Sequence, residues 1–270
     1  MNELKISIIT PSYNQGKFIE ATILSIKNQS HKNIEHIIVD GGSSDDTLEI
    51  IKRYDGTYNM RWISEKDEGQ ADAINKGFCM SNGDIVTWLN SDDTYNDGAL
   101  EFVNKYFSEN VDDQFIYGPA NTIDEHGNLI KSSDGVADYD VELLRRRDYI
   151  CQPSTFYRKK LIDKIGMVDK SLYWTMDWDL WLRASKECSL KKVEFTLSNM
   201  RIYEGIKTLS KLDKRSMEMS RVLKKNGVKN FSKHYYYVVG LVQGVSLKYP
   251  RLYNILKKCI KPIKKCIIKD

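Results

Sequence analysis

Two adjacent acids, Asp92 and Asp93, directly follow an apolar run from Asp84 to Leu89. The run has the composition of a buried strand, so the acids are expected where a strand leaves a sheet. Carboxylate oxygens at one point suit a hard divalent cation, Mn²⁺ or Mg²⁺, which can hold a diphosphate. A turn rich in Asn, Ser and Asp is the alternative, and the segment Asn90-Ser91-Asp92-Asp93 alone does not decide between them.

The elements that must position these acids alternate between strand and helix. Strands are predicted at 5–10, 35–40, 60–64 and 84–89; helices are predicted at 17–28, from a cap at Ser43 or Ser44 to about 56, and at 70–80. This order indicates an α/β fold with a doubly wound, mostly parallel sheet. Ligands of such sheets bind beyond the carboxyl ends of the strands. Four loops, 11–14, 40–43, 65–69 and 90–93, should therefore meet at one rim.

The second half of the chain is less regular. Its predicted elements are strands at 115–118 and 154–157, a hairpin over 123–130, a helix over 177–186 and a basic helical segment from about 210. We predict two domains, a catalytic domain over 1–208 and a basic helical C-terminal extension over 209–270.

Charge is divided unevenly along the chain. Residues 201–270 contain 18 Lys and Arg against 4 Asp and Glu, whereas the whole chain carries a net charge of only +4. The acidic first 200 residues argue against a nucleic-acid partner. The tail from Tyr235 to Asp270 interleaves bases with apolar residues, so it either lies on an anionic membrane surface or packs on the catalytic domain.

The cysteines indicate a reducing compartment. There are five, an odd number, and none form a Cys-x-x-Cys pair. A disulfide framework or a structural zinc site is therefore not expected. The N-terminus enters a strand without the apolar core of a signal peptide. We predict a cytoplasmic protein, peripheral on the inner face of the membrane if the tail binds lipid.

Three segments together carry a resemblance to a known family. Ile6 to Asn14, Val39 to Thr47 and Leu89 to Asp93 resemble the motifs of family 2 glycosyltransferases, in the same order. The resemblance extends over about Lys5 to Lys207. It implies the GT-A fold and inverting transfer of a sugar from a nucleotide diphosphate to a hydroxyl group.

The resemblance also implies residues that bind the donor. Pro11 and Tyr13 would form a flat wall against the base, Asp40 would accept a pyrimidine N–H, and Asp92 would bind ribose or sugar hydroxyls. The remaining residues of this set are Asn14, Asp67, Asp72 and Lys207. Helix capping is the alternative role for Asp40, and a favourable charge at a helix N-terminus is the alternative for Asp72.

The metal motif departs from the family pattern. Asp93 would bind the cation, but Asn90 occupies a position that is often Asp. Tyr203 stands about where the family often has a His, before Lys207. Because a phenol is a poor substitute for imidazole as a ligand, metal ligation from this loop is in doubt.

Inverting transfer needs a carboxylate base, and the resemblance places it at Asp177. Asp179 is the competitor; it lies roughly 200° around a helix from Asp177 and four residues before Arg183, so we predict that it forms a surface ion pair. An N-cap role is the alternative for Asp177. Gln152, Trp174 and Trp178 are predicted near the donor sugar or the acceptor.

The resemblance predicts a metal-dependent glycosyltransferase, of hexosyl or N-acetylhexosaminyl type, with a UDP-sugar as donor. A glycan, in particular a lipid-linked polysaccharide precursor, is the predicted acceptor. The alternatives are a nucleotidyltransferase that makes sugar nucleotides and a non-catalytic module that binds nucleotide or glycan. The first needs a Gly-rich phosphate loop after the first strand, where this chain has one Gly, Gly16. Asp93 and Asp177 argue against the second.

Overall fold

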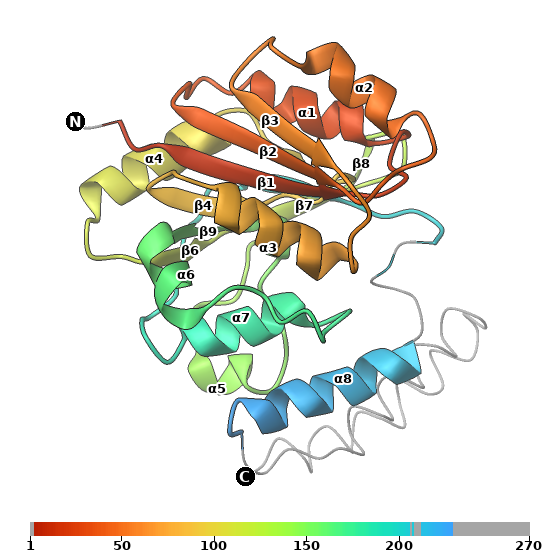
Figure 1. Ribbon diagram of the computed structural model, residues 1–270. Helices are drawn as coiled ribbons and strands as arrows, with labels where there is room; N and C mark the ends of the chain where they lie inside the picture. Colours follow the sequence, from red (N-terminus) through yellow and green to blue (C-terminus); the bar gives the residue numbers. More distant parts are fainter. Residues whose placement is uncertain (1–2, 206, 208–211, 229–270) are drawn as a thin grey trace.

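The computed structural model describes residues 3–205, 207 and 212–228 (Figure 1). The first half alternates between strand and helix as predicted: β1 (Ile6–Ser12), α1 (Ile19–Lys27), β2 (Ile34–Asp40), α2 (Thr47–Tyr54), β3 (Met60–Ser64), α3 (Gln70–Met80) and β4 (Ile85–Trp88). The elements that follow are β5 (Thr94–Tyr95), α4 (Ala99–Glu109), β6 (Phe115–Tyr117), β7 (Ala120–Ile123), β8 (Leu129–Lys131), α5 (Val141–Leu144), the 3-10 helix η1 (Gln152–Ser154), β9 (Thr155–Arg158), α6 (Lys159–Ile165), α7 (Met176–Ala184), β10 (Lys191–Lys192), β11 (Ser198–Arg201) and α8 (Leu212–Lys225).

A seven-stranded sheet in the order β10-β6-β9-β4-β1-β2-β3 forms the centre of the molecule. The pairs among β1 to β4 are parallel, which confirms the predicted doubly wound core. β9 runs antiparallel between β4 and β6. The sheet is therefore mostly parallel, as the GT-A fold requires.

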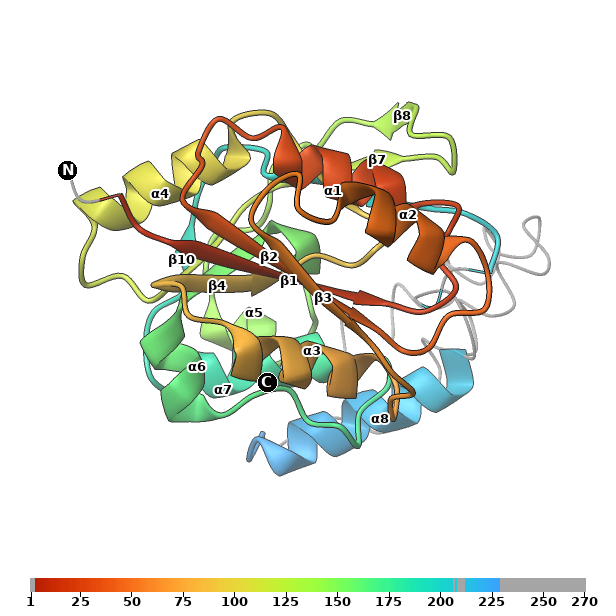
Figure 2. The same cartoon turned by 45° about the horizontal axis from the view of Figure 1, so that its top comes forward.

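Helices cover both faces of this sheet (Figures 1 and 2). β1 shows why both faces must be covered, because Ile8 packs with α1 and α4 on one face and Ile9 packs with α3 on the other. α3 lies especially close to β1 at Gly77, where an added Cβ would come within 2.3 Å of Ile9. A larger residue there would push α3, and the loop before it, away from the sheet.

A second sheet of four short strands, in the order β5-β11-β7-β8, lies beside the first. The hairpin predicted over 123–130 corresponds to β7 and β8, which pair antiparallel. β11 pairs with β7 in parallel and with β5 antiparallel. This sheet brings Arg201, at the end of β11, next to the acids that follow β4.

Helix α8, which lies beyond the domain boundary predicted at 208, packs on the domain that precedes it. Val222 and Leu223 are fully buried, and Lys225 forms ion pairs with Asp169 and Asp179. α8 is thus an integral part of the domain. The remainder of the predicted extension, including the tail from Tyr235 to Asp270, lies outside the described residues.

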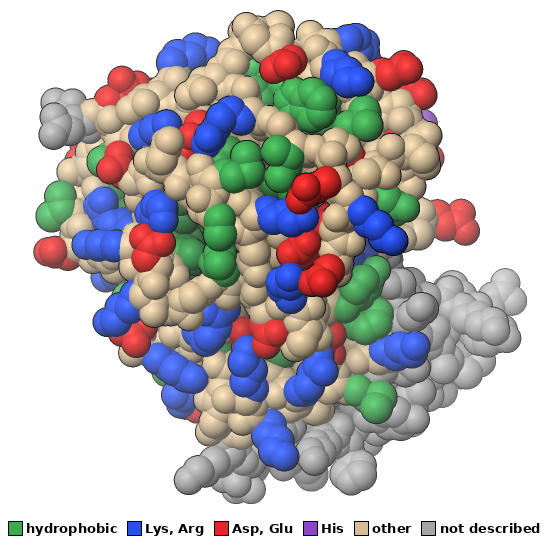
Figure 3. All heavy atoms as spheres, in the orientation of Figure 1, with side chains coloured by type: hydrophobic (Ala, Val, Ile, Leu, Met, Phe, Trp, Pro, Cys, Tyr) green, Lys and Arg blue, Asp and Glu red, His purple; other side chains and the backbone are tan. Residues whose placement is uncertain are grey.

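Charges of both signs mix on the surface. Lys and Arg side chains are interspersed with Asp and Glu over the face in Figure 3. No helix within the described part of the chain has the length and apolar character needed to cross a bilayer.

Candidate active site

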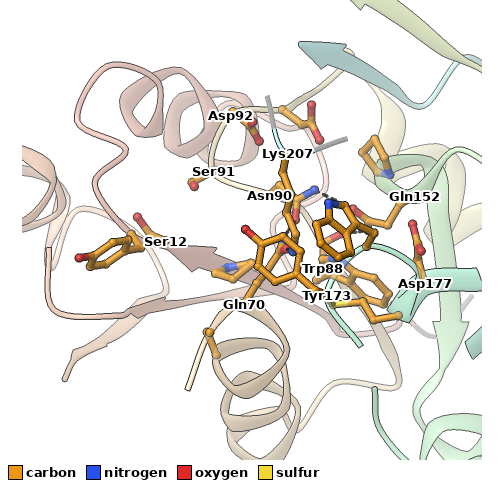
Figure 4. Close-up of a pocket in the computed structure, with 18 of the residues that line it drawn as sticks. Ser12, Gln70, Trp88, Asn90, Ser91, Asp92, Gln152, Tyr173, Asp177 and Lys207 are labelled. Atoms are coloured by element: carbon orange, nitrogen blue, oxygen red, sulfur yellow. Dashed lines mark hydrogen bonds between the residues drawn. The ribbon is translucent and has the colours of Figure 1, made fainter. Parts of the chain in front are cut away.

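A cleft of about 690 Å³ opens at the carboxyl ends of β1 to β4, where the four polar loops were predicted to meet. Its walls contain residues of all four loops and also of η1, α7 and α8. Figure 4 shows Asn90, Lys207 and Tyr173 near the middle of the cleft, with Ser12 at one side and Asp177 at the other. The sheet therefore brings donor-side and acceptor-side candidates into one cavity.

Asp92 and Asp93 line this cleft just after β4. The hydroxyl of Tyr203 donates to Oδ2 of Asp92 at 3.0 Å, and the backbone N–H of Arg201 donates to Oδ1 of Asp93 at 2.9 Å. Burial raises the pKa of both carboxyls, and the charge of Asp92 adds to the rise in the pKa of Asp93. Two buried, adjacent carboxylates favour a cationic partner.

The chemistry of this pair fits Mn²⁺ or Mg²⁺, which both accept carboxylate oxygens. Among the described residues, no three or more His, Cys, Asp or Glu side chains are grouped to hold a metal. Asp93 and Asp92 are the residues of the cleft that would hold such a cation. Burial, followed by the charge of Asp92, raises the pKa of Tyr203, which keeps it a neutral hydrogen-bond donor.

Asp177 is positioned by the packing of α7 on the central sheet. Trp181 of α7 stacks on Trp88 of β4, with ring centroids 5.8 Å apart. Both indoles are buried. Burial of a large apolar side chain stabilises the folded protein by about 1.5–3 kcal/mol. Asp177, the second residue of α7, consequently faces the cleft.

The environment of Asp177 suits a proton acceptor. Burial raises the pKa of its carboxyl, while the charges of Arg215 and Lys207 oppose this rise. A base with a pKa closer to neutrality accepts a hydroxyl proton more readily. Oδ1 of Asp177 accepts the N–H of Trp178 at 2.8 Å, which restrains the carboxylate at the start of α7.

Pro11, Tyr13, Asp67 and Gln152 also line the cleft, as does Lys207. Tyr13 is 60% exposed, so its ring is accessible to a flat ligand. The ammonium of Lys207 lies 3.9 Å from the ring centroid of Tyr173 and donates to Oε1 of Gln70 at 2.5 Å. Burial lowers the pKa of Lys207 to about 8.

Gln152 frames the cleft through two hydrogen bonds. Its Nε2 donates to the carbonyl of Trp88 at 2.7 Å, and its Oε1 accepts from Asn90 at 3.1 Å. Asn90, at the position that departs from the family pattern, thus connects the metal motif to η1. Trp174 lines the cleft beside Tyr173, with ring centroids 4.6 Å apart.

The contact of Asp40 with the base stays a prediction; in the structure its carboxylate is bound by the loop after β2 and by Ser64. The side chain is fully buried. Its oxygens accept hydrogen bonds from the backbone of Gly42, from the backbone and hydroxyl of Ser43, and from Ser64. Asp40 therefore shapes the loop after β2. The predicted cap of α2 by Ser43 or Ser44 is wrong, because α2 begins only at Thr47.

The contacts of Asn14 and Asp72 with the donor stay predictions; in the structure both side chains bind neighbouring residues. Asn14 adopts a left-handed backbone with φ 51°, and its side chain accepts the N–H of Ser44. Asp72, in the first turn of α3, forms ion pairs with Lys76 and Lys170. Its place in the first turn of α3 agrees with the alternative role, a favourable charge at a helix N-terminus.

Trp178 and Asp179 both point away from the cleft. Trp178 is fully buried and its indole N–H donates to the carbonyl of Leu144, so the prediction that it contacts a sugar is wrong. Asp179 forms the predicted ion pair with Arg183, but its side chain is buried instead of on the surface. Lys225 and Asn226, from α8 and the residue after it, complete its hydrogen bonds.

Several polar residues of the cleft were not predicted as site residues, among them Gln70, Asp148 and Arg215. Burial and the charge of Asp177 raise the pKa of Asp148, whereas the charge of Arg215 lowers it. Asp148 lies four residues before Gln152, so proximity to that motif was its only sequence signal. No sequence feature marks Arg215 as a site residue, because it is one base among many in the C-terminal segment.

A family model described as Glycosyl transferase family 2 matches residues 7–166, which is more than half of the chain. The chain belongs to this family. This result confirms the resemblance on which the site residues were chosen.

Several curated proteins resemble this family 2 glycosyltransferase. A chondroitin synthase from Escherichia coli is 27% identical over 209 residues, which cover 77% of this chain and 30% of that protein. A PGL/p-HBAD biosynthesis glycosyltransferase from Mycobacterium tuberculosis is 30% identical over 184 residues, or 66% of this chain and 68% of that protein. The chain spans only 19% to 35% of the length of the first curated relatives that it matches.

Solved structures confirm the GT-A fold of this glycosyltransferase family member. TarS from S. aureus, in complex with UDP-GlcNAc, has a TM-score of 0.69 and 19% identity, and covers 90% of this chain and 73% of its own. The mannosyltransferase PcManGT from Pyrobaculum calidifontis, in complex with GDP-Man and Mn²⁺, has a TM-score of 0.65 and 12% identity, and covers 99% of this chain and 83% of its own.

Proposed function

We propose that this protein transfers a sugar from a nucleotide diphosphate, a UDP-sugar, to a hydroxyl of a glycan acceptor with inversion of configuration. One observation carries the proposal: a single cleft contains Asp92 and Asp93, from the loop after β4, and the buried Asp177 from α7. The pair suits a divalent cation that would hold the diphosphate, and Asp177 suits the attacking hydroxyl. The family and the fold agree with this chemistry.

The roles of the residues follow from charge and position. Asp177 would accept the proton of the acceptor hydroxyl as its oxygen attacks the anomeric carbon. Lys207 would contact the departing diphosphate, and Tyr13 with Pro11 would contact the base. A divalent cation held by Asp93 would offset the negative charge that develops on the leaving group.

The ligands of the structural neighbours support a nucleotide-sugar donor. TarS is described with UDP-GlcNAc and with UDP, and PcManGT with GDP-Man and Mn²⁺. We choose UDP because the loop residues resemble those of family members that use it. A hexosyl or N-acetylhexosaminyl group is the sugar proposed.

A screen of nucleotide sugars tests the proposal. The protein is incubated with each donor and Mn²⁺ or Mg²⁺, and release of the free nucleotide and thermal stabilisation are measured. We expect one donor class to be hydrolysed slowly and to raise the Tm. NMR of the transferred sugar then gives the anomeric configuration, and retention would contradict the proposal, as would a lack of binding by every donor.

The loop after β1 argues against the nucleotidyltransferase alternative. Its backbone N–H groups donate to side chains that follow β2: Asn14 to Ser43, Gln15 to Thr47 and Gly16 to Asp45. A phosphate-binding loop would need these N–H groups for its ligand. The non-catalytic alternative predicts binding without turnover in the same screen.

Donor affinity should weaken as the pH rises through about 8. The low pKa of Lys207, about 8, means that its ammonium loses charge in this range, and a neutral amine attracts a diphosphate less. Titration with UDP and Mg²⁺ at pH 7 and pH 9 measures the change, for which we expect about a tenfold loss in affinity. Lys207→Arg stays charged and should bind equally at both pH values. If UDP affinity depends on pH in Lys207→Arg as it does in the wild-type protein, another group causes the change.

The acceptor proposed is a lipid-linked polysaccharide precursor, and the protein is proposed to work at the cytoplasmic face of a membrane. The basis is the sequence beyond the described residues, where Arg251 and six Lys from 250 onward are opposed only by Asp270. Each base near an anionic leaflet contributes about 1 kcal/mol of attraction.

Deleting the residues from Pro250 onward should abolish co-sedimentation with anionic vesicles, while activity on a small soluble acceptor survives. Salt screens this attraction, so the full-length protein should leave the vesicles as ionic strength rises. Neutral vesicles are the control. A large fall in Tm on truncation, with no vesicle binding by the full-length protein, would show instead that the tail packs on the catalytic domain.

A further inference from the structure

Glu218 of α8 is a buried carboxylate that accepts hydrogen bonds from a distant loop. Its Oε1 accepts the N–H groups of Trp174 and Thr175 at 2.7 and 2.8 Å and the hydroxyl of Thr175 at 2.8 Å. Its Oε2 accepts the N–H of Tyr173 at 2.8 Å. The side chain is only 7% exposed. A buried charge of this kind is tolerated when strong hydrogen bonds replace its lost hydration.

The loop held by Glu218 leads directly into the proposed catalytic base. Tyr173 and Trp174 line the cleft, and α7 begins one residue after Thr175, with Asp177 as its second residue. Because the N–H groups of three successive residues bind one carboxylate, Glu218 restrains the backbone that leads into α7. Arg215, one turn before Glu218 on α8, lines the same cleft.

We propose that Glu218 is a positioning residue for the sugar-transfer reaction: by holding residues 173–175 it sets the place of Asp177 in the cleft. The proposal rests on the proposed function, because it assumes that Asp177 acts on the acceptor. It extends the active site to α8, a helix that the sequence placed outside the catalytic domain. A small displacement of a reacting group lowers a rate far more than it lowers affinity.

The other end of α8 provides a matched control. Asp179 of α7 is likewise a buried carboxylate, and it binds Lys225 and Asn226 at the far end of α8. Asp179→Asn weakens the packing of α8 on α7 but leaves in place the backbone hydrogen bond from Asp179 to Thr175. If Glu218 only holds α8 in place, the two substitutions should have the same effect on catalysis.

The experiment compares Glu218→Ala, Glu218→Gln and Asp179→Asn in the full-length protein. Hydrogen exchange of the amides of residues 173–175, Tm, UDP affinity with Mn²⁺, kcat and KM are measured. For Glu218→Ala we expect exchange of these amides at least about tenfold faster, kcat lower by about tenfold to a hundredfold and UDP affinity within about twofold of wild type. Glu218→Gln keeps the oxygen that accepts three of the four bonds. It should therefore recover most of kcat.

Asp179→Asn should lower the Tm but keep kcat within about threefold and leave exchange at 173–175 unchanged. Normal kcat in Glu218→Ala despite faster exchange would overturn the positioning role, and so would equal losses of kcat in Glu218→Ala and Asp179→Asn. If the wild-type protein transfers no sugar, the proposed function fails and the role in that reaction fails with it. The hydrogen-exchange comparison then still shows whether Glu218 holds the loop.

Discussion

Asp177→Asn should lower the rate of sugar transfer by about a hundredfold or more while UDP affinity stays within about twofold of wild type. Asparagine keeps the size of the side chain and an oxygen that can accept the N–H of Trp178, so the start of α7 should be preserved. It cannot accept the proton of an acceptor hydroxyl. A hundredfold loss corresponds to about 2.7 kcal/mol of activation free energy.

The pH profile gives an independent check on Asp177. Because burial raises its pKa, the wild-type kcat should fall as the pH drops through a value above 3.8, where the carboxylate becomes protonated. The residual activity of Asp177→Asn should lack this acidic limb. Single-turnover transfer at several pH values, with donor saturating, measures both effects.

Asp179→Asn, on the same helix, is the control for Asp177. It removes a carboxylate that binds Arg183, so it should lower the Tm with transfer retained within about threefold. If Asp179→Asn loses transfer and Asp177→Asn keeps it, the assignment of the base is wrong. Before Asp148 is considered as the base in that case, Asp148→Asn has to be measured in the same assay.

Asp93→Asn should abolish the metal-dependent part of UDP binding and lower turnover by about a hundredfold or more. The amide retains an oxygen that can accept the N–H of Arg201, so the loop after β4 keeps its contact with β11. What it loses is the charge that attracts a divalent cation. Thermal shift and calorimetric titration with UDP, each with and without Mn²⁺, measure the loss independently of catalysis.

Asp97→Asn serves as the control for the metal site, because Asp97 is an exposed acid four residues after Asp93. It should behave as wild type in every titration. Full transfer by Asp93→Asn, or by the wild-type protein in excess chelator, would contradict the metal dependence. Comparison of Mn²⁺ with Mg²⁺ in the same titrations shows which ion the protein prefers.

The sequence predicted the elements from β1 to β4 well, because each is specified locally, but it did not predict β5 or α4. β3 and α3 have the predicted bounds, and the other strands differ by one or two residues. Strands buried on both faces appear as short apolar runs, and parallel strands must place their carboxyl ends at one edge. The cleft at that edge, with Asp67, Asp92 and Asp93 in its walls, follows from this rule alone.

The family motifs were less reliable for single side chains. Asp40, Asn14 and Asp72 lie in matched segments, but their side chains are engaged by neighbouring loops and lysines. A motif gives the position of a residue along the chain, whereas the direction of its side chain depends on the partners within reach. Trp178 illustrates the same limit, because its burial depends on α5.

The sequence by itself determined the parallel core, the rim where the acids meet and the family. Tertiary structure alone decided that β9 enters the sheet antiparallel and that Asp148 and Arg215 face Asp177. It also decided that α8 belongs to the catalytic domain, through the bonds of Glu218. The physical reason is range: periodicity and turns act over a few residues, whereas these contacts join residues that lie about 30 to 70 positions apart in the chain.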